Sequence, residues 1–91
     1  MEARLECMAY PGQFSGEYAV TMDTIRGRVS LFATDAEVEL ESPLDNGPVG
    51  ATLRVTVIET SGNHLLVKLP RPALETGEFV TVDQARVRQE A

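Results

Sequence analysis

Two alternating segments on either side of a short turn constrain the fold of this chain more than any other feature. Residues 53–60 read Leu-Arg-Val-Thr-Val-Ile-Glu-Thr, and residues 64–69 resume the alternation as His-Leu-Leu-Val-Lys-Leu. Because successive side chains of a β-strand point to opposite faces, the odd-numbered residues of both segments should face one core. Such pairing needs an odd number of turn residues, so we predict a three-residue turn at 61–63. A two-residue turn would set Val57 opposite Lys68 and mix the two faces.

A second hairpin is predicted in the first third of the chain. Its inward residues have even numbers in the first strand and odd numbers in the second, so its loop should contain an even number of residues. A loop of four residues places Val20 opposite Leu31. The same register sets Asp23 opposite Arg28 on the outer face, a pair of opposite charge that contributes about 0.2–1 kcal/mol.

Turn-forming residues divide the rest of the chain into short strands as well. Clusters of Gly, Pro, Asn and Ser recur at a spacing of roughly 8–12 residues, and no window has helical periodicity beyond about two turns. We therefore predict an all-β protein, a small single-domain antiparallel β-barrel spanning residues 1–91, OB-like or similarly partly open, with six to eight short strands. Segment 83–90 is compatible with a last strand or with a short helix capped by Asp83. The expected strands are 3–9, 17–23, 28–34, 36–41, 51–60, 64–69 and 78–83. Residues 85–88 would form the eighth strand if segment 83–90 is extended.

The inward positions of these strands define an expected core. Cys7, the only cysteine, lies in an alternating run and is predicted to be a small buried hydrophobic residue rather than a reactive thiol. The other expected core residues are Leu5, Val20, Leu31, Val38, Leu40, Leu53, Val55, Val57, Leu65, Val67, Leu69, Val80 and Val82.

Composition and charge narrow the classes of function. The chain has 43% hydrophobic residues, which favours a folded globule, and a net charge of −6. Residues 1–45 contain nine acidic and three basic side chains, whereas residues 46–91 contain five of each. An acidic surface repels phosphate backbones, which makes nucleic acid an unlikely partner without excluding it. No apolar segment approaches the ~20 residues of a membrane span and no export signal is recognisable, so we expect no membrane association and a cytoplasmic location.

Segment 35–41 carries four carboxylates that alternate with apolar residues. In a strand they would form one row on one face, spaced about 7 Å apart. We interpret this row as a solvent-exposed face or a charged edge strand that prevents edge-to-edge pairing. A basic protein partner and a calcium site are the alternatives, although a straight row does not match the curled loop of a typical calcium site.

Three apolar residues are predicted on the outer face of the sheet: Phe32, Ile58 and Leu66. The three-residue turn would pair Ile58 with Leu66, while the other hairpin directs Phe32 outward beside Ala19. Such residues can form a contiguous patch that binds another protein or a second copy of the chain. A loop at 42–50 or 70–78, or the C-terminal segment, could instead cover them.

Basic residues offer an alternative binding face. Arg54, Lys68 and Arg71 could gather near one end of the 53–69 hairpin, and Arg86 and Arg88 would share a face of an extended segment. An OB-like nucleic-acid-binding domain would combine these five residues with aromatic side chains, of which the chain has only five and no Trp.

Catalytic motifs are not recognisable. The one histidine, His64, follows a turn and should be exposed, and no spacing links it to a serine and an acid or to zinc-binding cysteines. We therefore expect a non-enzymatic protein without metal or cofactor, acting as an interaction or accessory module.

Overall fold

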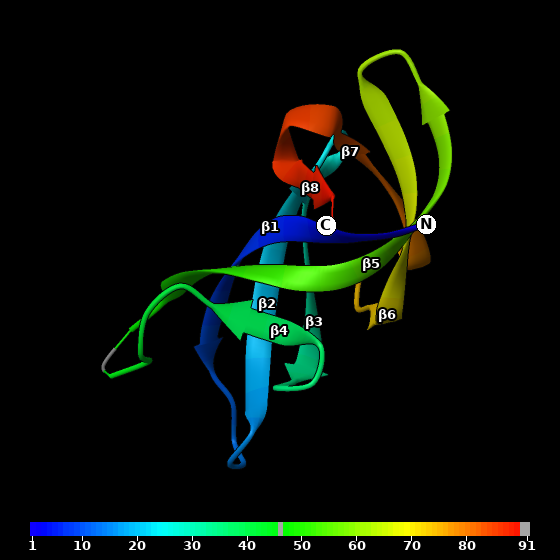
Figure 1. Ribbon diagram of the computed structural model, residues 1–91. Coiled ribbons are helices and arrows are strands. Elements are labelled where there is room, and N and C mark those ends of the chain that lie inside the picture. The colour runs from blue at the N-terminus through cyan, green and yellow to red at the C-terminus, as the bar shows by residue number, and fades with distance from the viewer. Residues whose placement is uncertain (46, 90–91) are drawn as a thin grey trace.

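The computed structural model describes residues 1–45 and 47–89, and its regular secondary structure consists of β-strands apart from one 3₁₀ turn (Figure 1). The all-β prediction is confirmed, and each predicted strand has a counterpart, although the predicted strand 36–41 is much shorter than expected. The strands are β1 (Glu2–Pro11), β2 (Glu17–Thr24), β3 (Gly27–Thr34), β4 (Val38–Leu40), β5 (Val49–Ser61), β6 (His64–Ala73), β7 (Gly77–Asp83) and β8 (Val87–Gln89), with a single 3₁₀ turn, η1 (Gln84–Arg86), before β8.

The strands form one antiparallel sheet in the order β3-β2-β1-β5-β6-β7. β1 and β5 each pair with two different strands along one of their edges. β1 pairs with β5 along most of its length, while its other edge pairs with β8 at Ala3–Leu5 and with β2 at Met8–Pro11. β5 likewise pairs with β4 over its first half and with β6 over its second half. These splits curl the sheet into a half-barrel (Figure 1).

β3 and β7 are the two end strands of the sheet order. Hydrogen bonds connect β3 and the turn before it to β7 and the turn before it. The N–H of Ile25 donates to the carbonyl of Thr81 at 3.0 Å, and the N–H of Leu74 donates to the carbonyl of Ser30 at 2.8 Å. The N–H and hydroxyl of Ser30 both donate to the Glu75 carboxylate at 2.9 Å. Hydrogen bonds from Ser30 also hold the pKa of Glu75 below its usual value. The open side of the half-barrel is therefore bridged by local contacts rather than by a strand ladder.

The β5–β6 hairpin differs from the predicted register. Its turn contains two residues, Gly62 and Asn63, and Gly62 has a φ of 61°, a left-handed conformation that glycine adopts without steric cost. The ladder then shifts at a β-bulge, where Leu66 pairs with Glu59 and Ile58 is the additional residue. The predicted three-residue turn and the one-to-one pair of Ile58 with Leu66 are therefore wrong. Beyond the bulge, Val57 pairs with Val67 as predicted.

The β2–β3 hairpin has the predicted register. Val20 pairs with Leu31 and Asp23 pairs with Arg28. The Arg28 Nε lies 3.2 Å from Asp23 Oδ1, so the predicted cross-strand ion pair is formed. The strands continue for one further pair, which leaves a turn of two residues.

The core lies on the inner face of the curled sheet, where the predicted core residues meet. All of them are buried except Leu40 and Val57, which are partly buried and packed against the core. Cys7 is buried as predicted. Several small or flexible residues complete the core: Ala3, Ala9, Met22, Val29, Ala33, Ala51 and Ala73.

The C-terminal segment combines both predicted alternatives. Asp83 caps η1, since its Oδ1 accepts a hydrogen bond from the Ala85 N–H at 2.9 Å. The chain then becomes extended and forms β8, which pairs with the start of β1. Residue 90 of the predicted segment lies outside the described residues.

Candidate functional site

Three large apolar side chains lie close together on the outer face of β5, β6 and β7. The bulge keeps Ile58 beside Leu66. Leu66 pairs with Thr81 and Lys68 pairs with Phe79, so Leu66 and Phe79 are diagonal neighbours on the same face. Ile58 is 50% exposed and Phe79 is 52% exposed, whereas Leu66 is partly buried. About half of the Ile58 and Phe79 surface is therefore left open by the described residues, although Thr76 of the predicted covering segment 70–78 lies beside Phe79.

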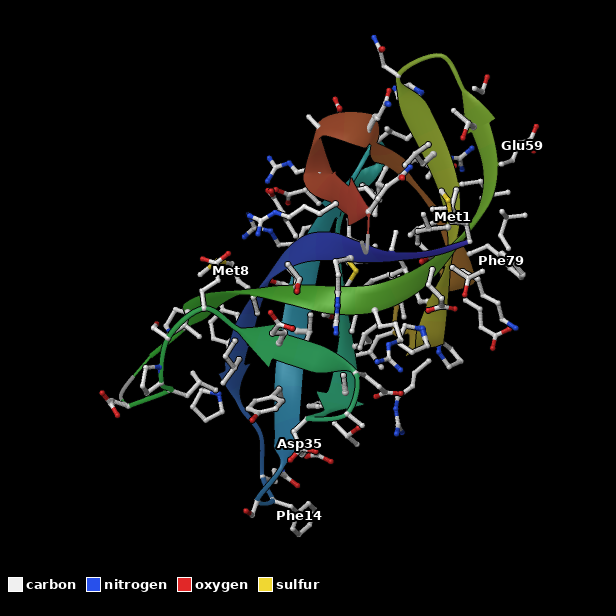
Figure 2. All side chains as sticks on the ribbon, viewed as in Figure 1. Met1, Met8, Phe14, Asp35, Glu59 and Phe79 are labelled. Atoms are coloured by element: carbon white, nitrogen blue, oxygen red, sulfur yellow. The ribbon has the colours of Figure 1, made fainter. Side chains whose placement is uncertain are left out.

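The β2–β3 turn extends this surface across β7. Because the Ile25 N–H is bonded to the Thr81 carbonyl, the Ile25 side chain lies next to β7, where it is 49% exposed. Ile25 and Phe79 line a shallow groove together with Arg26. We call the four residues Ile25, Ile58, Leu66 and Phe79 the apolar strip. Figure 2 shows Phe79 and Glu59 near one end of the molecule, far from Phe14 and Asp35.

Phe32 does not adjoin the apolar strip through the sheet. It is half-exposed, and it pairs with Ala19, which in turn pairs with Tyr10 near the end of β1. Ile58 lies instead beside the start of β1, because Val57 exchanges hydrogen bonds with Met1. Phe32 stays a predicted binding residue, but on a separate part of the surface.

Sequence reasoning missed Phe79 and Ile25 for different reasons. The alternation of residues 78–82 places Val80 and Val82 inward, and this pattern already indicates that Phe79 faces outward. Ile25 lies in a turn, where side-chain alternation does not predict which way a residue faces. Its position next to β7 depends on the closure of the barrel.

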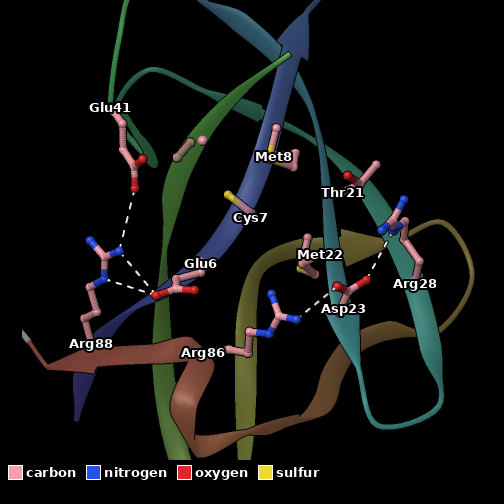
Figure 3. A pocket seen from close by; sticks show the side chains of 12 residues that line it. Glu6, Cys7, Met8, Thr21, Met22, Asp23, Arg28, Glu41, Arg86 and Arg88 are labelled. Carbon is pink, nitrogen blue, oxygen red and sulfur yellow. Dashed lines mark hydrogen bonds and ion pairs between the residues drawn. The ribbon is translucent and has the colours of Figure 1, made fainter.

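A second candidate site is a groove where β2 separates from β1. The pairing of β1 with β2 begins at Met8, and that with β8 ends at Leu5, so among the described residues no strand pairs with Glu6 and Cys7 on this edge. The gap opens a groove of about 330 Å³. We call it the charged groove (Figure 3), and it is lined by Glu6, Cys7, Met8, Thr21, Met22, Asp23, Arg28, Glu41, Gly50, Ala51, Arg86 and Arg88.

Ion pairs line two sides of the charged groove. On one side, the Asp23 carboxylate contacts Arg28 at 3.2 Å and Arg86 at 3.5 Å. On the other side, the Arg88 guanidinium contacts Glu6 at 3.2 Å and Glu41 at 3.7 Å. These contacts also tie η1 and β8 to the body of the sheet.

The basic residues predicted for nucleic-acid binding do not form one face. Arg86 lies in the 3₁₀ turn η1 rather than in an extended segment, and it lines the charged groove with Arg88, where each contacts carboxylates. Arg71 contacts Glu37, with 2.9 Å between Arg71 Nε and Glu37 Oε1. Arg54 and Lys68 line a different groove, next to Glu2 and Glu78. The five side chains are thus divided among three places.

The predicted acidic row is wrong. Only Val38–Leu40 is a strand, and Glu37 lies in the preceding turn. The Glu37 carboxylate accepts hydrogen bonds from the Thr34 N–H at 3.0 Å and from Arg71. Glu39 and Glu41 contact two further arginines, Arg4 and Arg88. The physical reason is that residues 35–37 form a turn before β4, and Glu37, Glu39 and Glu41 each contact an arginine of another element.

Cys7 lies at the floor of the charged groove, where burial disfavours its thiolate form. Burial and the nearby Glu41 carboxylate raise the pKa of the Cys7 thiol to about 12. Because the thiolate is the nucleophile, we expect Cys7 to react with Ellman's reagent at neutral pH roughly a thousandfold more slowly in the folded protein than in urea. Equal rates with and without urea would contradict this prediction. The variant Glu41→Gln should react somewhat faster than the wild type.

Other features of the described chain add no further site. His64 is exposed after its turn, as predicted. Within residues 1–45 and 47–89, no three His, Cys, Asp or Glu side chains are grouped to hold a metal ion, and no helix is long and apolar enough to cross a membrane. Comparisons with known proteins return no relative: no family model, no curated protein and no solved structure matches the chain.

Proposed function

We propose that this chain is a non-enzymatic interaction module that binds another protein chain through the apolar strip. The observation that carries this proposal is the half-exposure of Ile25, Ile58 and Phe79 around the partly buried Leu66. Exposing adjacent large apolar side chains to water is unfavourable, and burial against a partner removes that cost. The proposal keeps Ile58 and Leu66 from the sequence prediction and adds Ile25 and Phe79.

The surroundings of the apolar strip support a protein partner. Polar side chains border it, including Glu59, Lys68 and Thr81. An apolar centre with a polar rim is the usual composition of a protein interface. Aromatic residues near such a centre contribute most of the binding free energy, which makes Phe79 the expected anchor.

The alternative function, nucleic-acid binding, has less support. Arg71, Arg86 and Arg88 are engaged by carboxylates, so a phosphate would have to compete with these ion pairs. Phosphate contacts dominate nucleic-acid affinity. A cytoplasmic location is part of the proposal and rests on the sequence.

The proposal is tested by site-specific photocrosslinking. A photoreactive amino acid replaces Ile58 in one variant and the exposed Glu39 of β4 in a matched control. We expect a crosslinked protein adduct from position 58 only. The further change Phe79→Lys should weaken the interaction by about 2 kcal/mol, or roughly 30-fold, and remove the adduct.

Light scattering shows whether the partner is a second copy of the chain. Together with the crosslinking yields, it also gives the result that would contradict the proposal. If the mass of the purified chain rises with concentration, the adduct is a second copy of the chain. If the chain is monomeric and position 58 gives no more adduct than position 39, the apolar strip is not an interface. Thermal unfolding of Phe79→Lys shows whether the fold is retained.

A further inference from the structure

The two sides of the charged groove carry opposite net charges. Arg28 and Arg86 share the single carboxylate of Asp23, which leaves one positive charge on that side. Glu6 and Glu41 share the single guanidinium of Arg88, which leaves one negative charge on the other side. Figure 3 shows Glu6, Glu41 and Arg88 on one side of the groove and Asp23 and Arg28 on the other, with the Arg86 side chain reaching toward Asp23 between them.

Both sides retain hydrogen-bonding capacity. A guanidinium has five N–H donors, and the contacts to Asp23 engage only the Nε of Arg28 and one terminal nitrogen of Arg86. On the negative side, Arg88 contacts one oxygen of Glu6 and one oxygen of Glu41. A ligand can therefore add to each side without displacing the existing ion pairs.

The floor between the two sides is apolar. Cys7, Met22 and Ala51 line the groove and belong to the buried core. In Figure 3 the side chains of Cys7 and Met22 lie between the two charged groups. A short aliphatic chain would lie against this floor, and sulfur-containing side chains adapt to such a contact.

Because Gly50 has no side chain, the Glu41 carboxylate can lie next to it on the negative side of the groove. A Cβ atom at this residue would lie 2.7 Å from Glu41 Oε2. The Glu41 carboxylate therefore occupies space that any larger residue at position 50 would fill. The change Gly50→Ala displaces this carboxylate without altering the charge of the protein.

We propose that the charged groove binds a small zwitterion, an amino acid or ω-amino acid whose carboxylate contacts Arg28 and Arg86 and whose ammonium group contacts Glu6 and Glu41. A volume of about 330 Å³ is at the lower end of the range for small-molecule sites, which suits a ligand of this size. The site does not involve the apolar strip, so the two proposals succeed or fail independently.

The test is an amide NMR titration of the full chain with leucine, 4-aminobutanoate and 6-aminohexanoate. Hexanoate and hexylamine, which each carry one of the two charges, are the matched ligand controls. At least one zwitterion should saturate with a Kd of about 1 mM, and each control should bind about tenfold more weakly. The shifts should map to Cys7, Met22 and Gly50.

Variants on each side complete the test. Arg86→Gln, Glu41→Gln and Gly50→Ala should each weaken binding about tenfold, whereas the exposed-site controls Arg54→Gln and Glu59→Gln should not change it. Thermal unfolding identifies any variant that has lost its fold, and Arg28→Gln then replaces Arg86→Gln. The proposal is overturned if no zwitterion saturates by about 20 mM, if a singly charged control binds equally well, or if the groove variants retain wild-type affinity.

Discussion

Leu53→Ala is expected to lower the free energy of unfolding by about 2–5 kcal/mol. Leu53 is fully buried, and it pairs with Leu5 of β1 on one side and with Val38 of β4 on the other. Truncation removes apolar contacts to both neighbours and leaves a cavity that two hydrogen-bonded ladders prevent from collapsing. Since small domains have a total stability of only about 5–15 kcal/mol, the change should be visible as a large shift of the urea midpoint.

The matched control for this prediction is Leu74→Ala. Leu74 is 69% exposed and lies just after β6. The same chemical change there should alter the free energy of unfolding by no more than about 0.5 kcal/mol. Similar losses for both variants would mean that Leu53 does not occupy the centre of the core.

Glu37→Ala is expected to lower the free energy of unfolding by about 2 kcal/mol, and Glu37→Gln by about 1 kcal/mol. The Glu37 carboxylate joins the end of β3, through Thr34, to Arg71 of β6. Alanine removes both contacts, whereas glutamine keeps an acceptor for the Thr34 N–H and loses only the charge. Urea unfolding at neutral pH measures both changes.

The effect of Glu37 should depend on pH. Burial of its carboxylate raises the pKa, but hydrogen bonds from Thr34 and Arg71 outweigh burial and hold the pKa of Glu37 below its usual value. A depressed pKa in the folded state contributes stability that is present above the unfolded pKa and is lost as the pH falls through the folded pKa. The difference between wild type and Glu37→Gln should therefore shrink in acid. A difference that is constant from neutral pH to below the folded pKa would contradict this origin.

The β5–β6 hairpin shows how far alternation can predict a structure. A three-residue turn, and a two-residue turn followed by a one-residue bulge, both set Val57 opposite Val67. Both arrangements therefore keep the apolar residues of β5 and β6 on one inner face, and the hydrophobic pattern cannot distinguish them. The bulge changes the pairs next to the turn, where Leu66 pairs with Glu59 instead of Ile58 and Leu65 pairs with Thr60 instead of Glu59.

The candidate sites were harder to predict because they combine distant segments. Phe79 was accessible to sequence reasoning, since its strand alternates clearly. Ile25 was not, because it reaches β7 only after the barrel closes. In the charged groove, Arg88 contacts Glu6 across a separation of 82 residues. Patterns among residues that are neighbours in the sequence cannot predict a contact over that separation.

The sequence by itself determined the all-β class, most of the core and the register of the β2–β3 hairpin. These features follow from side-chain alternation and turn residues, which act between neighbours along the chain. The tertiary structure decided where β1 and β5 change partners, where the barrel closes, and which charges meet. Those outcomes depend on long-range strand pairing, and a carboxylate such as Glu37 takes whichever cation the completed sheet brings within reach.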